Sequence, residues 1–410
     1  MNGKNYVCTN LSLFFFSFIS PLRNKFLRVY KFDELKKIFK FRSSFIKMKT
    51  QKVLLAMSGG VDSSVAAYLL KKQGYEVIGA FMKNWSDTKN KYTGECAWRD
   101  ERRFAQQIAL KLKIPLITLD FEKQYKKDVV AEMFKKYKKG ITPNPDIDCN
   151  QKIKFPLLWK EAQKRNINLI ATGHYARVKK EKGKYFLFRA KDESKDQSYF
   201  LYRLNEDDLK HILFPIGELT KPEVRKIAKK LGFPNYNKKS TVGICFIGKV
   251  NLKDFLQKKI KAKKGKILSP NGKIIGEHDG IYYYTIGQRI GPRYGIEVSK
   301  LEDGKRQLNR WYVARKDVKK NIIIAAPENH PLLFRQKIIV KDFHLITKTK
   351  IPSRVFTRIR HVGELLPSAL KKENKKWIVK LNKPITGVSE GQAIVLYDKQ
   401  KVLGGGEISF

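Results

Sequence analysis

A polar, glycine-rich segment between a short apolar run and a helix-like stretch is the feature that most constrains this fold. The apolar run at 53–57 predicts a buried strand, and apolar residues at helical spacing over 65–73 predict a helix that Gly74 closes. Between them stands Ser58-Gly59-Gly60-Val61-Asp62-Ser63. Glycines let the backbone approach a phosphate closely, and the amides at the start of a helix point toward an anion. The segment therefore predicts a phosphate-binding turn, with a merely capped turn as the structural alternative.

The side chains of this turn support the same interpretation. The hydroxyls of Ser58 and Ser63 add hydrogen-bond donors, and Asp62 can cap the helix or help to hold Mg²⁺. The lysine of a P-loop kinase or GTPase is missing from the motif. A different class of nucleotide-binding loop is therefore indicated.

Strand and helix patterns alternate along the first 250 residues. Strands are predicted at 52–57, 76–82, 116–119 and 169–172, helices at 65–73, 98–113, 129–138 and 155–166, and loops at 84–96 and 141–150. Such alternation is typical of an α/β fold with a parallel sheet and crossover helices. In these sheets ligands bind beyond the carboxyl ends of the strands, where the predicted loops lie.

The pattern changes near residue 250, where short strand-like pieces separated by glycine turns begin. After Leu332 apolar and polar residues alternate, and 398–400 reads as a hairpin turn. We expect a small β-rich central domain at 251–331 and a C-terminal β-barrel at 332–410, after an N-terminal nucleotide-binding domain at 51–250.

The charge balance indicates an anionic partner. The 410 residues include 86 Lys and Arg but only 38 Asp and Glu, a formal net charge of +48. Nucleic acid is the simplest partner for such a chain. A general lysine bias spread over a solvated surface is the alternative.

Residues 1–50 differ from the rest of the chain. They carry eleven Lys or Arg and two acids, and their apolar patch at 11–19 is too short to span a bilayer. An organelle-targeting leader, a dispensable tail and a translation start at Met48 all remain open. We expect no membrane association and a cytoplasmic location, with an organelle as the alternative if these residues are a transit peptide.

The four cysteines, Cys8, Cys96, Cys149 and Cys245, are too few and too scattered for a disulfide framework, and no spacing suggests zinc. A reducing compartment follows, in which an important thiol would be catalytic. Cys149 lies in a polar loop three residues after Asp146, so a lowered pKa and a nucleophilic role fit it. A bystander thiol at Cys149 and a structural cysteine at Cys245 are the alternatives.

Taken together, the motifs resemble the tRNA-specific 2-thiouridylase family, a branch of the PP-loop ATP pyrophosphatases. The resemblance runs from Lys52 to Phe410. It is carried by MSGGVDSSVAAYLL, GAFMKNW, TPNPDIDCN, IKF, ATGHYAR, KDQSYFLY, STVGICFIG, YTIGQR and LGGGEI. It implies a PP-loop domain of the adenine nucleotide alpha hydrolase type, followed by a central β-rich tRNA-binding domain and a C-terminal β-barrel.

The resemblance also implies a reaction. The family uses ATP to adenylate the C2 oxygen of the wobble uridine in tRNAs of the Lys, Glu and Gln type, and a cysteine persulfide then delivers sulfur. The products are 2-thiouridine, AMP and pyrophosphate. The implied requirements are ATP with Mg²⁺, tRNA, and a sulfur-donor protein that is either a cysteine desulfurase or a relay. The target base must leave its stack to react.

Site residues follow from the resemblance, position by position. Cys149 is the expected nucleophile, Cys245 the persulfide carrier and Asp146 a candidate general acid or base, and the two cysteines are expected to pair as a disulfide once sulfur has left. The expected ATP contacts are Ala56, Met57, Ser58, Gly59, Gly60, Val61, Asp62, Ser63, Met82 and Gly173. The expected tRNA contacts are Asn144, Pro145, Asp146, His174, Lys195, Asp196, Gln197, Arg358, Ile359 and Gln392. No resident metal site is expected in the protein.

Three positions depart from the family pattern. Ala56 replaces a glycine, Asp148 an apolar residue and Ile359 a tyrosine. We expect the methyl group of Ala56 to be tolerated, the charge of Asp148 to raise the pKa of Cys149, and base stacking at Ile359 to be lost.

Two other functions remain open at this point. A PP-loop ligase or amidase that activates a carboxylate would need no paired thiols, so replacement of Cys245 by Ser would leave it active. A noncatalytic RNA-binding protein with a relic ATP loop would show no tRNA-dependent exchange between ATP and pyrophosphate.

Overall fold

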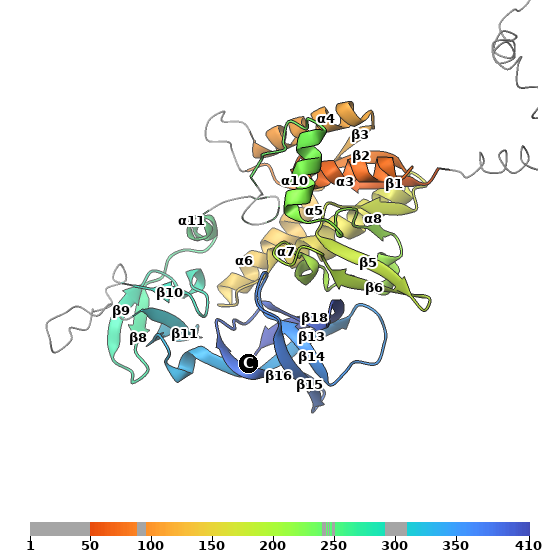
Figure 1. The fold of residues 1–410 in the computed structure, drawn as a ribbon. Coiled ribbons are helices and arrows are strands. Elements are labelled where there is room, and N and C mark those ends of the chain that lie inside the picture. Colours follow the sequence, from red (N-terminus) through yellow and green to blue (C-terminus); the bar gives the residue numbers. More distant parts are fainter. Residues whose placement is uncertain are drawn as a thin grey trace, which may run out of the picture. The chain divides into compact units, whose positions relative to one another are not determined.

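In the computed structural model, which describes residues 50–87, 96–239, 243, 245, 247, 251–291 and 310–410, the N-terminal part of the chain is built on a parallel sheet (Figure 1). The strand order is β3-β2-β1-β4-β7, and every neighbouring pair is parallel. The strands are β1 (Lys52–Ala56), β2 (Glu76–Lys83), β3 (Leu116–Asp120), β4 (Leu169–Ala171) and β7 (Ile212–Leu213). The predicted leader, residues 1–50, lies outside the described residues except for Thr50.

Helices cover both faces of this sheet. In β1, Val53 and Leu55 pack into one hydrophobic cluster, whereas Leu54 belongs to the other. The first cluster contains residues of α3 (Val61–Lys72), α4 (Ala97–Leu112) and α10 (Lys221–Lys230), and the second contains residues of α8 (Phe155–Gln163). Burial on both faces explains why the strand is a continuous apolar run rather than an alternating one.

The strand order places a switch point between β1 and β4. The chain moves outward from β1 to β2 and β3, and then returns on the other side of β1 with β4. Ligands bind at such switch points, beyond the carboxyl ends of the strands. The loops that leave β1 and β4 therefore meet at the expected crevice.

The predicted loop at 141–150 is wrong in its second half, which forms the helix α7 (Pro145–Cys149). Proline suits the first position of a helix, where no intrahelical acceptor is available for an amide. The Asn144 side chain caps the helix by accepting the N–H of Ile147 at 3.4 Å. Pro145 is therefore part of a helix start, whereas Pro143 lies in the loop before the cap.

Two π-helical turns extend the helices near the crevice. The first, η1 (Lys126–Val130), joins α5 (Glu122–Tyr125) to α6 (Ala131–Lys138), so the helix predicted at 129–138 begins earlier. The second, η2 (Asn150–Lys154), joins α7 to α8. A π-turn of this kind is uncommon and occurs frequently at functional sites.

The C-terminal part is the predicted β-barrel. Its strands pair in the order β13-β16-β15-β14-β17-β18, and a further β13–β18 pairing closes the sheet. The strands are β13 (Phe334–Leu345), β14 (Arg354–Arg358), β15 (Leu366–Glu373), β16 (Lys376–Thr386), β17 (Ala393–Asp398) and β18 (Lys401–Ser409). The predicted hairpin turn at 398–400 joins β17 to β18, with Lys399 at a φ of 53°.

A hairpin that the sequence analysis missed links the two parts. Strands β5 (Ala176–Glu181) and β6 (Lys184–Arg189) follow β4, and β6 pairs with β18, with Phe188 opposite Lys401 and Leu187 opposite Val402. Short helices η3 (Ser198–Leu201) and α9 (Glu206–Leu209) then lead to β7. The hairpin thus attaches the N-terminal part to the barrel by main-chain hydrogen bonds.

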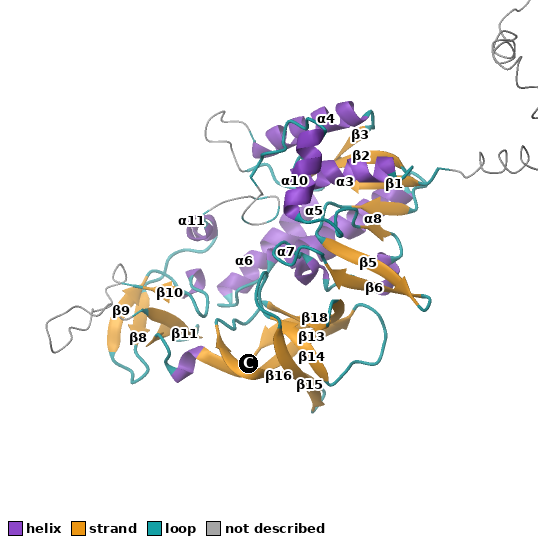
Figure 2. Ribbon diagram, in the orientation of Figure 1, coloured by secondary structure: helices purple, strands orange, loops and turns teal. Residues whose placement is uncertain are grey.

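The central part is β-rich, as predicted, and Figure 2 shows its strands beside a few short helices. Its sheet has the order β10-β11-β12-β8-β9. The elements are α11 (Leu252–Gln257), β8 (Gly265–Leu268), β9 (Ile274–His278), η4 (Ile281–Tyr283), β10 (Arg289–Ile290), β11 (Trp311–Asp317), β12 (Ile322–Pro327) and η6 (Pro331–Leu333). Tyr283 and Tyr284 are buried packing residues, and Ile281–Tyr283 forms a 3₁₀ turn.

Candidate functional site

The loop after β1 has the backbone of an anion-binding turn. Gly59 has a φ of 75°, and a Cβ there would lie 2.1 Å from the carbonyl oxygen of Glu101. Gly60 is the N-cap of α3, and no side chain caps this helix. The first amides of a helix have no intrahelical acceptor, so those of α3 remain available to an anion.

Serine hydroxyls hold the turn in shape. Ser63 Oγ donates to the Gly60 carbonyl at 3.0 Å and accepts the N–H of Ser58 at 3.3 Å. The amide of Asn235, a residue that the sequence analysis did not single out, donates to the Gly59 carbonyl at 2.9 Å. Asn235 is 1% exposed, so this contact fixes the loop from outside the motif.

The loop after β4 comes into contact with the same turn. A Cβ on Gly173 would lie 2.7 Å from the backbone nitrogen of Ser63. Only glycine therefore fits between the two loops. This close approach brings the backbones of the two loops together at the switch point between β1 and β4.

Asp62 has partners that the sequence did not indicate. Its carboxylate binds Nζ of Lys221 at 2.6 and 2.7 Å, and it accepts the Tyr175 hydroxyl at 2.9 Å. It does not cap α3. Lys221 is the first residue of α10 and brings a cation to a loop whose own motif has none.

The other predicted ATP contacts differ in exposure. Met57, Val61 and Met82 are buried, with exposed fractions of 1%, 4% and 5%. Ala56 is partly buried at the end of β1, and Ser58 is exposed at the loop. Of the residues in this paragraph, Ser58 in the turn is therefore the exposed one.

The two distant cysteines meet. Cys149 Sγ lies 3.7 Å from Cys245 Sγ, and both are free thiols. Asp146 Oδ1 accepts the backbone N–H of Cys245 at 2.8 Å, so all three predicted catalytic residues are in one cluster. A disulfide needs the sulfurs about 2.05 Å apart, so the pair is adjacent but not bonded.

The surroundings shift the pKa values of the two thiols in opposite directions. Burial raises the pKa of Cys149 well above its usual range, with further contributions from Cys245 and Asp146. The hydrogen bond from the Cys149 thiol, together with Lys154, lowers the pKa of Cys245 against the effect of burial. Cys245 is therefore the better thiolate, and Cys149 is its hydrogen-bond donor.

Burial also raises the pKa of the Asp146 carboxyl group, although the Cys245 amide and Lys154 oppose this effect. A carboxyl group with a raised pKa can exchange a proton nearer to neutral pH than an exposed aspartate. Asp146 thus has the electrostatic character of an acid or base, in the place where the sulfurs meet.

One short segment connects the sulfur cluster to the phosphate-binding turn. Gly173 contacts the turn, and the next residue, His174, places Nε2 at 3.3 Å from Nζ of Lys154. Lys154 in turn is near enough to the Cys245 sulfur to lower the pKa of that thiol. The predicted ATP loop and the predicted sulfur carrier therefore belong to one site.

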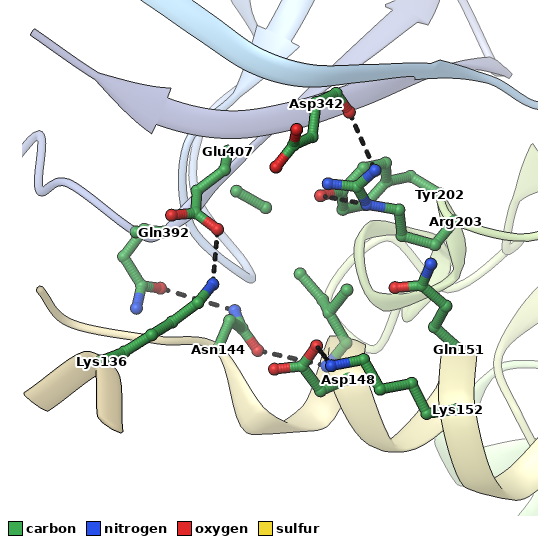
Figure 3. A pocket seen from close by; sticks show the side chains of 13 residues that line it. Lys136, Asn144, Asp148, Gln151, Lys152, Tyr202, Arg203, Asp342, Gln392 and Glu407 are labelled. Carbon is green, nitrogen blue, oxygen red and sulfur yellow. Dashed lines mark hydrogen bonds and ion pairs between the residues drawn. The ribbon is translucent and has the colours of Figure 1, made fainter. Parts of the chain in front are cut away.

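Two of the predicted tRNA contacts, Asn144 and Gln392, line a polar pocket of about 250 Å³, shown in Figure 3. Asn144 Nδ2 donates to Gln392 Oε1 at 3.4 Å, and Gln392 Nε2 donates to the carbonyls of Thr142 and Pro143 at 3.0 and 2.9 Å. Gln392 of the barrel thus holds the segment that leads into α7. Lys136 and Glu407 form an ion pair at 2.5 Å in the same pocket.

Helix α7 presents different residues to the pocket and to the sulfurs. Asn144, Ile147 and Asp148 line the pocket, whereas Asp146 and Cys149 contact Cys245. Asp148 binds Lys152 at 3.1 Å on the pocket side (Figure 3). The sequence analysis expected Asp148 to raise the pKa of Cys149. The carboxylate that contributes to this rise is instead Asp146.

The remaining predicted tRNA contacts are mostly enclosed. Asp196 is 1% exposed and binds NH1 of Arg358 at 2.8 Å, and Arg358 is itself 4% exposed. Ile359 is packed in the barrel core, where a side chain cannot stack on a base in this arrangement. Gln197 accepts the N–H of Tyr175, and Lys195 is exposed.

Sequence reasoning missed the two lysines of the site. Lys154 lies five residues after Cys149, a spacing that an α-helical pattern does not bring to one face. Lys221 lies within the capping box of α10, which begins at Thr220 and was a readable helix start. Only that second signal was available from the residues alone.

No helix among the residues that the structure describes is long and apolar enough to cross a membrane.

Three family models match the chain in succession. They are described as the tRNA methyl transferase HUP domain at residues 51–249, the tRNA methyl transferase PRC-barrel domain at 253–327 and the aminomethyltransferase beta-barrel domain at 335–408.

Curated relatives match over nearly the whole length of both chains. The tRNA-specific 2-thiouridylase MnmA 1 of Geobacillus kaustophilus is 43% identical over 363 residues, covering 87% of this chain and 95% of its own. The MnmA of Pediococcus pentosaceus is 40% identical and covers 87% and 94%. The MnmA of Methylobacillus flagellatus is 41% identical and covers 88% and 99%.

Proposed function

Because the chain belongs to the tRNA-specific 2-thiouridylase family, we propose that it uses ATP to replace the C2 oxygen of the wobble uridine in tRNA by sulfur. The products are 2-thiouridine, AMP and pyrophosphate, and the substrates are tRNAs of the Lys, Glu and Gln type. The observation that carries this proposal is the 3.7 Å approach of Cys149 and Cys245 beside the phosphate-binding turn.

The ATP part of the site rests on the turn after β1 and on Gly173. The α3 amides and the hydroxyls of Ser58 and Ser63 would bind phosphate oxygens, and Ala56, Met57, Val61 and Met82 would line the nucleotide site. Asp62 is the carboxylate that would hold Mg²⁺ together with those oxygens. Lys221 would then be released from Asp62 and free to meet the negative charge.

Adenylation solves the chemical problem of the reaction. The C2 oxygen of uracil is a poor leaving group, and an AMP ester at that oxygen departs readily as a phosphate. The attacking atom must then be a nucleophile that is ionised at neutral pH, which a sulfur anion supplies. The same site must therefore hold an ATP cradle and a reactive sulfur.

Sulfur delivery follows a balanced sequence. The terminal sulfur of a Cys245 persulfide forms a bond to C2, and the C2–O bond breaks so that AMP leaves with its electron pair. Cys149, after giving its proton to Asp146, attacks the Cys245 sulfur. The bond between Cys245 and the transferred sulfur breaks, the C2=S group keeps that electron pair, and a Cys149–Cys245 disulfide forms. A thiol reductant then resets the pair.

Contacts to tRNA are proposed along the face where the pocket opens. Asn144, Pro145 and Asp146 would meet the target base, and Gln392, His174 and Lys195 would lie near the anticodon. The formal charge of +48 supports backbone contacts to a polyanion. Four predicted contacts that are mostly enclosed would support this surface from the interior, and would touch tRNA only after tRNA binding exposed them. They are Asp196, Gln197, Arg358 and Ile359.

The remaining parts of the proposal concern partners and place. A cysteine desulfurase or a relay protein would load Cys245 with sulfur. We propose a cytoplasmic location, or an organelle if residues 1–50 are a transit peptide.

Reconstitution tests the function directly. Purified protein, ATP, an unmodified tRNA and a persulfide donor should yield 2-thiouridine, measured by mass spectrometry of digested tRNA. Cys149→Ser and Cys245→Ser should each abolish the product, while Cys96→Ser, at a thiol outside the cluster, should keep it. If Cys245→Ser retained full activity, a ligase that needs no thiol would be the better assignment.

A further inference from the structure

Lys154 is a charged side chain that acts on both thiols and that the proposed reaction does not yet use. It is the last residue of η2, and Cys149 is the last residue of α7, five positions earlier. In an α-helix five residues turn through about 500°, which leaves their side chains roughly 140° apart. In a π-turn the backbone bonds span five residues, as in the Phe155 N–H to Asn150 carbonyl bond here, so residues five apart lie on nearly the same face.

The π-turn therefore directs the Lys154 ammonium to the sulfur cluster. Its Nζ lies 3.3 Å from His174 Nε2 and near enough to the Cys245 sulfur to lower the pKa of that thiol. Cys149 and Asp146 are close enough to act on its charge. Three groups that can become anions thus share one cation.

His174 keeps this cation in place without competing for its proton. An ammonium group only donates, so Nε2 of His174 accepts, and Nδ1 carries the ring hydrogen toward Thr172 Oγ1 at 2.6 Å. Burial, together with Lys154, holds the pKa of His174 well below its usual range, so the ring stays neutral. Stacking on Phe155 at 5.7 Å fixes the ring further.

The ammonium stays protonated despite its partly buried position. Burial lowers the pKa of Lys154, but Cys245, Cys149 and Asp146 outweigh that effect and raise it. The titratable groups that act on this cluster are Cys149, Cys245, Asp146, His174, Tyr125 and His361. Lys154 supplies the positive charge at neutral pH, because burial lowers the pKa of both His174 and His361.

We propose that Lys154 is a further catalytic residue, a fixed cation that stabilises the Cys245 thiolate when it accepts sulfur and the anionic outer sulfur of the Cys245 persulfide when it delivers sulfur. The proposal rests on the proposed sulfur-transfer function. In the loading step, the Cys245 thiolate attacks the outer sulfur of the donor protein's persulfide. One S–S bond forms, the donor's S–S bond breaks, and the donor leaves as a thiolate. Lys154 gives up no proton in this step and stabilises the charge that moves.

The test measures the ionisation of Cys245 and needs no turnover. Alkylation of the full-length protein by iodoacetamide, followed across about pH 5 to 10 by mass spectrometry of the Cys245 peptide, gives the pH midpoint of the thiol. Lys154→Met should raise this midpoint by at least about one pH unit and slow alkylation at pH 7 by roughly tenfold. Lys154→Arg should stay near wild type, and so should Lys160→Met, which removes an exposed lysine of α8.

A second measurement separates this inference from the proposed function. In a single turnover with tRNA, Lys154→Met should still release pyrophosphate from ATP but form 2-thiouridine at least about tenfold more slowly. An unchanged Cys245 midpoint in Lys154→Met, or in Lys154→Gln if the first variant does not fold, would overturn the inference. A wild-type protein that makes no 2-thiouridine would overturn the function, whatever the midpoints are.

Discussion

Single residues set the geometry of the phosphate-binding turn, and Gly173 is a clear example. Its missing side chain lets the loop after β4 touch the backbone of Ser63. The next residue, His174, then contacts Lys154 beside the sulfurs. Adding a single carbon atom at Gly173 should therefore displace groups both in the turn after β1 and in the sulfur cluster.

Gly173→Ala should disable the ATP half of the reaction. The added Cβ would lie 2.7 Å from Ser63 N and 2.9 Å from the carbonyl carbon of Asp62, and both are main-chain atoms that cannot rotate away. A displacement of about 1 Å in a reacting group can cost a hundredfold in rate. We expect tRNA-dependent pyrophosphate release to fall by about that factor.

The matched control for this variant is Gly291→Ala, because no heavy atom of the residues that the structure describes lies within 4 Å of the Cβ it would add. It should keep its pyrophosphate release. Equal activities of the two variants would contradict the close contact between the loops.

The buried ammonium of Lys316 makes the free energy of unfolding depend on pH. Burial lowers its pKa from 10.5 to about 8, while its Nζ donates to the Tyr284 carbonyl at 2.7 Å. Between pH 8 and 10.5 the unfolded chain keeps a proton that the folded chain releases, so the free energy of unfolding rises with pH. The full difference corresponds to roughly 3 kcal/mol.

Urea unfolding at several pH values measures this contribution. The gain in unfolding free energy from pH 7 to 10 should be smaller in Lys316→Met than in wild type by an amount on the order of 2–3 kcal/mol. Lys320→Met, at an exposed position of the same part of the chain, should follow the wild type. A wild-type slope in Lys316→Met would show that the ammonium is not buried as described.

At the scale of elements, the parallel strands and the glycine turn between β1 and α3 were predictable because each is a local pattern. The strands at 52–57 and 116–119 end within a residue or so of their expected places, as β1 and β3 do in the structure. Helix α7 was not predicted, because Pro145 at a helix start looks like a loop residue until its cap is seen. The π-turn η2 was not predictable, since no periodicity distinguishes its extra residue.

The capping box of α10 links a helix start to the ATP loop. Thr220 Oγ1 accepts the N–H of Glu223 at 3.4 Å, and the Glu223 carboxylate accepts the N–H of Thr220 at 2.6 Å. The first residue of the helix is Lys221, whose ammonium binds Asp62. The cap therefore fixes the cation at the loop.

Thr220→Ala should lower the free energy of unfolding by about 1 kcal/mol, the usual cost of a lost N-cap. Because Lys221 would also lose its fixed position, the KM for ATP should rise, and urea unfolding and steady-state kinetics measure the two effects. Thr220→Ser keeps the accepting oxygen and should stay near wild type in both. A Thr220→Ala variant with unchanged stability would mean that the cap contributes nothing.

At the scale of the whole molecule, contacts between distant parts of the chain were beyond sequence reasoning. The approach of Cys149 and Cys245 spans 96 positions, and the pairing of β6 with β18 joins strands more than 200 residues apart. No local pattern reports such contacts, because they depend on how finished elements pack. The family resemblance supplied the roles of the cysteines, but only the fold brings their sulfurs together.

A buried charge cluster ties the barrel to the N-terminal part of the chain. Asp196 follows the β5–β6 hairpin, and its Oδ2 lies 2.8 Å from Arg358 NH1 of β14 and 3.6 Å from Arg189 Nε of β6. The side chains of all three are at most 5% exposed. Buried charges without a counter-ion are strongly destabilising, so this carboxylate is needed by both arginines.

Asp196→Asn should therefore lower the free energy of unfolding by about 3–5 kcal/mol, because it leaves two buried guanidinium groups without their shared anion. Glu193→Gln is the matched control, since Glu193 also binds Arg189, at 3.1 Å, but is 62% exposed and should contribute less than about 1 kcal/mol. Urea unfolding followed by tryptophan fluorescence measures both, and a double change of Asp196→Asn with Arg358→Met should recover part of the loss. If Asp196→Asn cost no more than Glu193→Gln, the cluster would not be the brace between barrel and sheet, and the pairing of β6 with β18 would have to hold them together alone.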